Sequence, residues 1–281
     1  MKSQTFNWHC RDRDLRCDRT LIMGILNATP DSFSDGGRFV DPALAVAHGL
    51  KLAAEGADIL DVGGESTRPG AAPVEEAEEL RRVVPLVQAL AERTPCLISI
   101  DTTKAGVARA ALAAGAHIIN DVSGATWDPG MPAVAVEFQA GLVLMHAQGR
   151  PQTMQHAPQY ADVVTEVRDF LMARLAELTA AGLPRANMVV DPGIGFGKTL
   201  EHNLTLLRHL DQLTSLGCPL LIGVSRKALL GKLTGHEKPE QRLAAGLAAQ
   251  TVAILRGARI LRTHDVAAGR DAARVADALQ R

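Results

Sequence analysis

The sequence lacks the features that mark membrane, secreted or zinc-binding proteins. Its four cysteines are scattered without a C-x-x-C pair, which argues against a zinc site or a disulfide framework. No apolar run approaches the roughly 18 residues that a membrane span needs, and the N-terminus MKSQTFNWHCRDRDLRC has no hydrophobic stretch typical of a secretory signal. We therefore expect a cytoplasmic protein with no membrane partner.

Neither sign of charge dominates the chain. Lys and Arg number 30 against 31 Asp and Glu in 281 residues, so the formal net charge is -1. Because no global positive field can attract a phosphate backbone, nucleic acid is not an expected partner. Any anion must be bound by a local group of residues.

Aromatic residues are also scarce, at 3% of the chain, although 47% of the residues are hydrophobic and can bury a full core. Phe33 and Phe196 nevertheless fall in predicted loops rather than in the core. Two phenylalanines in loops are unexpected unless they cover a ring-shaped ligand.

Short apolar runs alternate with stretches of helical spacing along the whole chain. Eight runs read as strands: 21–26, 57–63, 96–101, 117–121, 142–146, 187–191, 220–225 and 258–264. Helices fit at about 42–56, 75–92, 104–115, 130–139, 160–182, 203–215, 239–256 and 266–280. Strict alternation indicates parallel strands, and eight such units predict an α/β fold, a single TIM (β/α)8 barrel over residues 21–281 after an N-terminal lead-in at 1–20.

The alternative architecture is a doubly wound open sheet, which usually has fewer units and a glycine-rich turn after its first strand. Here the first strand is followed by NATPDSFSDGG, which is too long and too polar for that turn. The loops after strands one and two, at 27–40 and 63–74, exceed the usual two to six residues of such connections. Long loops on a rigid scaffold are candidate lids.

Polar residues finish most of the predicted strands. In a TIM barrel the active site lies at the C-terminal ends of the strands, so these side chains should converge on one pocket. They are Asn27, Asp101, Asn120, Asp191, Ser225, Lys227, Arg262 and His264. The mixture of carboxylates, amides and cationic groups suits a hydrogen-bonding heterocycle next to an anion.

Each of these residues also has a simpler structural interpretation. Asp101 can be a helix N-cap, Asn120 or Asp121 can cap a helix equally well, and Asp191 opens an ordinary Asp-Pro-Gly turn. His146 on an apolar strand is typical of a core histidine, and the other histidines lack metal-ligand spacing. No metal is assigned to the histidines.

The segment GIGFGKT at 193–199 resembles a phosphate loop, but G-x-x-x-x-G-K-[ST] requires Gly where Pro192 stands. The G-x-G-x-G spacing alone is weak support for a dinucleotide site, because it does not follow the first strand. A flexible loop that displays Phe196 is the more useful interpretation.

The longer motifs, in their order, carry a family resemblance. From Leu21 to Val266 the chain resembles the bacterial dihydropteroate synthase family. The motifs are GILNATPDSFSDGG (24–37), DVGGESTRPGA (61–71), SIDTTKA (99–105), NDVSG (120–124), LMHAQGRPQTMQ (144–155), DPGIGFGKTLEHN (191–203), GVSRKALLG (223–231) and THDV (263–266). The resemblance implies a transferase of folate biosynthesis in which 4-aminobenzoate displaces pyrophosphate from a 7,8-dihydropterin-6-ylmethyl diphosphate. It also implies that sulfonamides, as aminobenzoate mimics, inhibit the enzyme.

The resemblance also implies roles for individual residues. The catalytic group is Asp101, Lys227 and Arg262. The pterin is bound by Asp101, Asn120, Met145, Asp191 and Lys227, and the diphosphate by Asn27, Arg68, Arg262 and His264. Aminobenzoate is bound by Phe33, Thr67, Pro69, Phe196 and Ser225. Asn27 is the expected ligand of Mg²⁺, an ion that keeps several waters and binds substrate phosphates.

Other roles stay open. Asp61, Glu65, Lys198 and Arg226 have no assigned contact, and ion pairs that stabilise loops are the simplest interpretation of them. The last two predicted helices are rich in Ala, Leu and Val, which permits a homodimer interface. Two rival functions remain: methyl transfer from a methylated folate to a corrinoid, which has no use for an anion site with two lids, and a non-catalytic homologue that keeps the fold.

Overall fold

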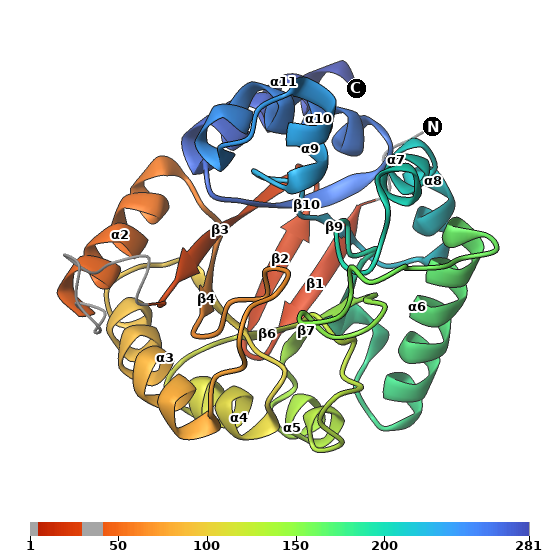
Figure 1. The fold of residues 1–281 in the computed structure, drawn as a ribbon. Coiled ribbons are helices and arrows are strands. Elements are labelled where there is room, and N and C mark those ends of the chain that lie inside the picture. Colours follow the sequence, from red (N-terminus) through yellow and green to blue (C-terminus); the bar gives the residue numbers. More distant parts are fainter. Residues whose placement is uncertain (1–4, 30–41, 281) are drawn as a thin grey trace.

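The computed structural model describes residues 5–29 and 42–280, which form a closed barrel of eight parallel strands ringed by helices (Figure 1). The strand order around the barrel is β10-β3-β4-β5-β6-β7-β8-β9. Each inner strand therefore neighbours the strands before and after it in the chain, and β10 closes the ring against β3. This is the predicted TIM-barrel architecture, and it is confirmed.

The elements follow one another as β-strand and α-helix units. The barrel strands are β3 (Leu21–Asn27), β4 (Ile59–Gly63), β5 (Leu97–Asp101), β6 (Ile118–Asp121), β7 (Gly141–Met145), β8 (Met188–Asp191), β9 (Leu220–Ile222) and β10 (Ala258–Thr263). The helices are α2 (Pro42–Glu55), α3 (Glu76–Ala91), α4 (Ala105–Ala113), α5 (Met131–Phe138), α6 (Val163–Ala180), α7 (Leu200–Arg208), α8 (Leu210–Leu213), α9 (Ala228–Thr234), α10 (Leu243–Leu255) and α11 (Val266–Leu279). Short 3-10 turns are η1 (Arg185–Asn187), η2 (Thr214–Leu216) and η3 (Pro239–Arg242).

The barrel interior has an apolar lower half. Alternate strand residues point inward, and those nearest the N-terminal ends of the strands form one buried cluster that includes Leu21, Ile59 and Val189. The residues that point outward pack with the helices into a larger cluster. This arrangement explains why the strands read as continuous apolar runs, since both of their faces are buried.

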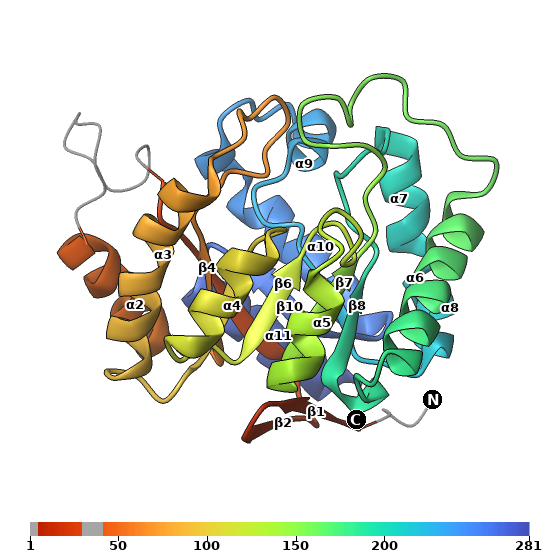
Figure 2. The same ribbon diagram turned by 90° about the horizontal axis from the view of Figure 1, so that it is seen from below.

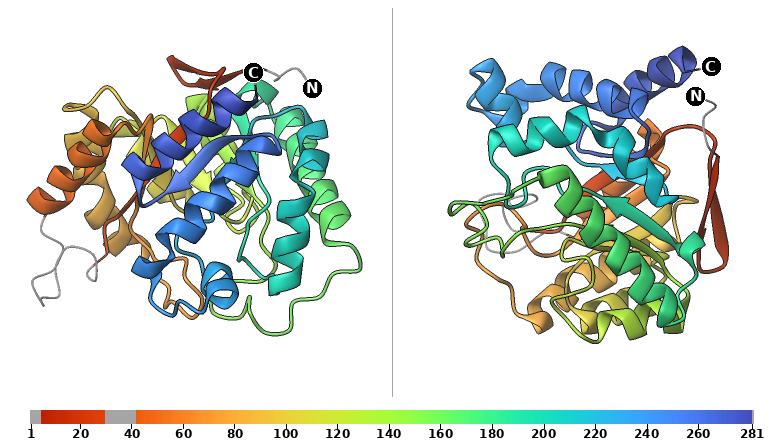
Figure 3. Two further views of the ribbon diagram at one scale, coloured as in Figure 1. Left: turned by 90° about the horizontal axis from the view of Figure 1, so that it is seen from above. Right: turned by 90° about the vertical axis from the view of Figure 1, so that its right-hand side faces the viewer.

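An antiparallel hairpin closes the lower end of the barrel. Its strands are β1 (Phe6–Cys10) and β2 (Arg13–Cys17), and Figures 2 and 3 show it lying across the barrel end opposite the long loops. Trp8, Cys10 and Cys17 are fully buried against the apolar cluster, and the Trp8 Nε1 donates to the Asn187 carbonyl at 2.9 Å. The cysteines therefore serve as packing residues, and burial raises the pKa of the Cys17 thiol to about 12.

Sequence reasoning located the barrel elements well and missed some of the connections. All eight strands overlap their predicted ranges. The predicted helix at 203–215 is instead α7, α8 and η2, and α9 was not predicted. The hairpin lies inside the segment expected only as a lead-in. A third long loop, at 146–162, connects β7 to α6 and was not singled out.

The two predicted lids differ in how much of them the structure describes. Residues 30–40 of the first lie outside the described residues, whereas the second, between β4 and α3, is described throughout. No helix in the described ranges is long and apolar enough to cross a membrane.

Candidate active site

The predicted strand-end residues lie at one end of the barrel, above the apolar layer and opposite the hairpin (Figure 2). Asp101 and Asp191 are the last residues of β5 and β8, Asn120 is the last but one of β6, and each is at most 6% exposed. Buried polar side chains are tolerated only where they find partners, so their contacts define the site.

The Arg262 guanidinium on β10 is the centre of these contacts. Its Nε donates to Asp61 Oδ2 at 2.6 Å and its Nη2 donates to Asp101 Oδ2 at 2.6 Å. The Asn120 amide also donates to Asp61 Oδ2, at 3.0 Å. Residues from β4, β5, β6 and β10 thus meet in one network that spans the barrel.

Burial and neighbouring charges shift the pKa values of Asp101 and Arg262 in this network. Burial raises the pKa of Asp101 to about 7, while the Arg262 charge opposes that rise and the Asp61 charge adds to it. The neighbouring carboxylates outweigh burial at Arg262 and raise its pKa. Arg262 therefore stays cationic and favours the ionised form of Asp101.

Lys227 and Asp191 lie near this network, and the charge of each shifts the pKa of the other. Lys227 Nζ donates to the Ile194 carbonyl and lies 4.7 Å from the centre of the Phe196 ring. Burial lowers the pKa of Lys227 to about 8, against an opposing effect of Asp191. One oxygen of Asp191 accepts from the Gly193 N–H at 2.7 Å. Phe196 is half-buried, as expected for a ring at the edge of a pocket.

Two neighbouring turns meet at the rim of the site. Ser225 Oγ accepts from the His264 backbone N–H at 3.2 Å and lies 3.1 Å from His264 Nδ1. Burial, together with the charges of the neighbouring arginines, lowers the pKa of His264 to about 4, against an opposing effect of Asp265. His264 is therefore neutral near pH 7. Arg68 and Arg226 lie near it, and Asp265 pairs with Arg226.

The glycine-rich segment after β8 fits closely against the backbone of the loop after β7. Gly193 and Gly197 have φ values of +68° and +62°, and a Cβ on them would lie 1.9 Å from the His146 carbonyl oxygen and 2.2 Å from that of Gln148. The glycines thus permit close backbone packing, which is a structural explanation of the G-x-G-x-G spacing.

Lys198 ties the same two loops together from inside. It is 3% exposed, and its ammonium contacts His146 Nδ1 at 3.0 Å and the carbonyls of Gly193 and Phe196 at 3.1 and 3.0 Å. Burial lowers the pKa of Lys198 to about 7. The expected ion pair is absent from the contacts described for Lys198, whose role is to hold backbone carbonyls.

The loop after β4 is anchored at its base. Lys104 pairs with Glu65 and with the fully buried Glu79, the latter at 2.6 Å. Farther out, the Gly70 N–H donates to the Pro151 carbonyl at 3.0 Å, which joins this loop to the one after β7. Thr67 is half-buried, and Arg68 and Pro69 are exposed at the mouth of the barrel.

The contacts show which of the strand-end residues act as helix caps or turn residues. Asp101 is not a helix cap, since α4 has Lys104 at its N-cap position and Asp101 contacts Arg262. Asn120 contacts Asp61 rather than a helix end, whereas Asp121 accepts from the Ser123 N–H in a local turn. Asp191 does form its turn, through Gly193.

Three further residues were predicted to lie in the site: Met145, Asn27 and Phe33. Met145 ends β7 and is 3% exposed, and Asn27 ends β3 and is half-buried. Phe33 lies outside the described residues. Within residues 5–29 and 42–280 no three His, Cys, Asp or Glu side chains group in a way that could hold a metal ion.

Sequence reasoning missed Asp61 as a member of the network. Asp61 is fully buried in the middle of β4, and a carboxylate inside the apolar run ILDVG is the signal that could have found it. Of the other unassigned residues, Glu65 and Arg226 do form ion pairs, with Lys104 and Asp265.

Comparisons with known proteins agree with this geometry. A family model described as pterin binding enzyme matches residues 23–264. The dihydropteroate synthase of Synechocystis sp. is 48% identical over 263 residues, which cover 94% of this chain and 91% of that protein. The structure of Xanthomonas albilineans dihydropteroate synthase with 4-aminobenzoic acid has a TM-score of 0.92 at 49% identity and 99% coverage of both chains. The same enzyme in complex with 7,8-dihydropteroate has a TM-score of 0.89 at 47% identity and 98% coverage of both.

The chain belongs to the pterin-binding enzyme family, as a TIM barrel whose buried carboxylates, amide and cations converge at one end. Within that family its activity is that of a dihydropteroate synthase, a transferase that makes 7,8-dihydropteroate for folate biosynthesis. The relatives above are synthases, which favours condensation over methyl transfer to a corrinoid.

The position of Asp61 generates the first prediction. Asp61→Asn removes the charge that holds Arg262 Nε, so kcat/KM should fall at least tenfold, in keeping with the roughly 1.5 to 3 kcal/mol of a hydrogen bond to a charged group. Steady-state kinetics with a thermal melt measures both activity and folding. The matched control is Ser99→Ala, because Ser99 is Asp61's register partner on β5, is fully buried, and its Oγ has no hydrogen-bond partner. Equal kinetics for the two variants would contradict the role of Asp61.

Proposed function

We propose that the enzyme carries out this condensation by a dissociative displacement, in which pyrophosphate leaves before aminobenzoate attacks. Loss of pyrophosphate leaves a positive charge delocalised into the dihydropterin ring. The observation that supports this step is the buried Asp101 carboxylate, which a barrel strand holds and which accepts from the Arg262 guanidinium, whose charge favours its ionised form. A fixed negative charge in a site that excludes water stabilises a developing cation.

We assign the pterin to the inner part of the site. Asp191 accepts from the adjacent ring N–H and amino group, and Asn120 and Asp101 meet the remaining ring nitrogens. Lys227 donates to the ring carbonyl, and Met145 covers one ring face. Support comes from the depth of Asp191, Asn120 and Met145, each of which is at most 6% exposed.

The diphosphate is assigned to the rim, with Arg262, His264 and Arg68. The Arg262 guanidinium has five N–H donors, of which the Asp61 and Asp101 contacts use two, so donors remain for an anion. The backbone amides that open α11 face the same region and favour negative charge.

Mg²⁺ is the proposed cofactor, with Asn27 as its protein ligand. In the β3-β4-β5 register Asn27 and Asp101 flank Gly63, and a Cβ there would lie 3.8 Å from Asn27 Oδ1 and 3.7 Å from Asp101 Oδ2. An amide oxygen beside a glycine suits a hard ion that takes its other ligands from water and phosphates. When bound, the ion neutralises charge on the leaving group.

Aminobenzoate is placed against the lids. Phe33, Thr67, Pro69, Phe196 and Ser225 are assigned to its ring and carboxylate. The contact between the loops after β4 and β7 supports a cover that excludes water from the cation. Sulfonamides that mimic aminobenzoate are proposed to compete at this place.

The cellular setting of the enzyme is also proposed. A cytoplasmic location fits four cysteines without disulfides. We further propose a homodimer through α10 and α11, which pack together and present exposed apolar side chains that include Leu255, Val275 and Leu279. A second copy that presents the same two helices can cover them by two-fold symmetry.

The proposed dimer can be tested by measuring the molecular mass of variants in solution. Val275→Glu on α11 places a charge among these side chains and should halve the mass measured by light scattering. Met172→Glu is the matched control, since Met172 on α6 is 52% exposed and lies on another part of the helical ring. Unchanged mass in both variants, or monomers already in the unmodified protein, would refute the interface.

The function is tested by product formation. Mass spectrometry should detect 7,8-dihydropteroate from the two substrates in the presence of Mg²⁺. Removal of Mg²⁺ with a chelator should lower the rate strongly, and Asn27→Ala should raise the Mg²⁺ concentration needed for half-maximal rate. Absence of turnover would leave a non-catalytic homologue, and a rate independent of Mg²⁺ would remove the proposed ion.

Asp101 gives the sharpest test of the mechanism. Asp101→Asn keeps the size of the side chain and removes the charge, so kcat and kcat/KM should fall together by about 10² to 10³, the typical loss for one preorganised electrostatic group. A carboxylate that only orients Arg262 would instead raise KM for the diphosphate substrate and leave kcat nearly unchanged.

Asp128→Ala is the control for a purely local role. Asp128 accepts from the backbone N–H groups of Ala105 and Gly130 at 2.7 and 2.8 Å. Its loss should cost about 1 kcal/mol of stability, as loss of a cap does, with kcat unchanged.

A further inference from the structure

The turn between Ser225 and Lys227 has an unusual backbone. Arg226, which separates these two proposed site residues, has φ +58° in the left-handed region, where non-glycine residues are uncommon. Its carbonyl accepts from Arg242 Nη1 at 2.9 Å. The turn therefore depends on side-chain contacts to keep its shape.

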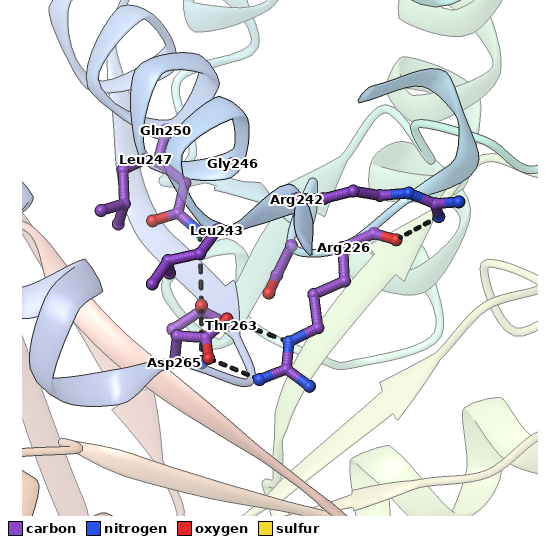
Figure 4. A pocket seen from close by; sticks show the side chains of 9 residues that line it. Arg226, Arg242, Leu243, Gly246, Leu247, Gln250, Thr263 and Asp265 are labelled. Atoms are coloured by element: carbon purple, nitrogen blue, oxygen red, sulfur yellow. Dashed lines mark hydrogen bonds and ion pairs between the residues drawn. The ribbon is translucent and has the colours of Figure 1, made fainter. Parts of the chain in front are cut away.

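The Arg226 side chain reaches across to the next turn of the barrel. Its Nη2 donates to Asp265 Oδ1 at 2.6 Å and its Nε donates to Asp265 Oδ2 at 3.1 Å, a two-bond pair that Figure 4 shows beside a small pocket under α10. Asp265 directly follows His264, so the pair and the Ser225–His264 contact join the same two turns.

Asp265 does not cap the helix that it precedes. It occupies the N-cap position of α11, where an aspartate side chain normally accepts from the N–H groups of the first helical turn, yet its side chain makes no capping hydrogen bond. Both oxygens of its carboxylate are directed to Arg226 instead. The first-turn amides of α11 are thus left without the cap that their own sequence offers.

We propose that Arg226 is a positioning residue that draws the Asp265 carboxylate away from the N-terminus of α11 and so keeps that helix end ready for the diphosphate. The proposal rests on the proposed function, because it assumes that the leaving group binds beside Arg262 and His264. Without Arg226, the Asp265 carboxylate turns back onto the first-turn amides. It then competes with the anion for donors and repels it.

Exposure of the pair argues against a mainly structural purpose. Arg226 and Asp265 are 33% and 21% exposed, and ion pairs this accessible contribute little to stability. Asp265 has a second anchor, since its backbone N–H donates to Thr263 Oγ1 at 3.2 Å. We therefore expect the backbone of the 263–265 turn to stay in place when the ion pair is removed.

A double-mutant cycle on the full chain tests the proposal, with inorganic pyrophosphate and Mg²⁺ as the probe in calorimetry. Arg226→Gln should weaken pyrophosphate binding about tenfold, in line with the charge lost and the carboxylate gained at the anion. Asp265→Asn alone should change binding less than threefold. In the Arg226→Gln background the same change should restore most of the affinity, because an asparagine on the helix end carries no charge.

Two further measurements separate positioning from folding. Hydrogen exchange of the first-turn amides of α11 should slow in Arg226→Gln, because they gain a cap. Lys232→Gln, an exposed change on α9 with the same loss of charge, should leave pyrophosphate binding unaltered. The KM for aminobenzoate at saturating pterin diphosphate should change less than the KM for the diphosphate.

The outcomes are distinct. If Asp265→Asn has the same effect in both backgrounds, the charges act independently and the positioning role is overturned. Equal losses in both single variants and the double variant would show an ordinary structural ion pair, which also overturns it. If the unmodified enzyme does not bind pyrophosphate, the diphosphate site itself fails, and this proposal fails with it.

Discussion

The site depends on one buried cation, the Arg262 guanidinium held between Asp61 and Asp101. A charge inside a barrel is costly unless it is paired and hydrogen-bonded, and unpairing one partner of such a group usually costs more than the pair contributes. Arg262 meets this condition with carboxylates from two different strands. Asn120 adds a donor to Asp61, so four strands are fixed relative to one another by side chains as well as by their ladders.

The barrel therefore has two layers of different chemistry. Leu21, Ile59 and Val189 fill the lower layer, and the hairpin with Trp8 seals it. The polar network occupies the layer above. Packing fills the lower layer, so the polar groups that can bind a ligand lie at the opposite end. Rigid strands then hold the charged groups in place, which is what electrostatic catalysis requires.

Much of this could be predicted because parallel barrels place function by a simple rule. Continuous apolar runs predicted the eight strands, and the polar residues that finish most of them marked the end at which Asp101, Asn120 and Asp191 lie. The rule fails for Asp61, which stands in the middle of its run rather than near its end. Partners such as Asp61 and Arg262, 201 positions apart, are brought together only by closure of the barrel.

Other features escaped prediction for related reasons. In the hairpin, charged or polar residues alternate with apolar ones. The apolar face is buried only because it packs against the barrel end, which the local sequence does not show. The loop at 146–162 is held by contacts with two other loops, through Pro151 and through Gly193 and Gly197, so its shape is set by distant residues. At Asp265 the local rule predicts a helix cap, and a long-range ion pair overrides it.

The charged groups lie in two regions along the barrel axis. Deep in the site the carboxylates of Asp61, Asp101 and Asp191 lie near the buried cations Arg262, Lys227 and Lys198. At the rim are Arg68 and the ion pair of Arg226 with Asp265. In the proposed reaction a cation forms at the pterin while a polyanion leaves toward solvent. Both ends of that charge separation then meet charges of the opposite sign, which are fixed before the bond breaks, so little reorganisation is needed during the step. Because Arg262 touches Asp61 and Asp101 and still has N–H groups for the anion, it joins the two regions, and its pairing to both carboxylates is what lets one residue serve both.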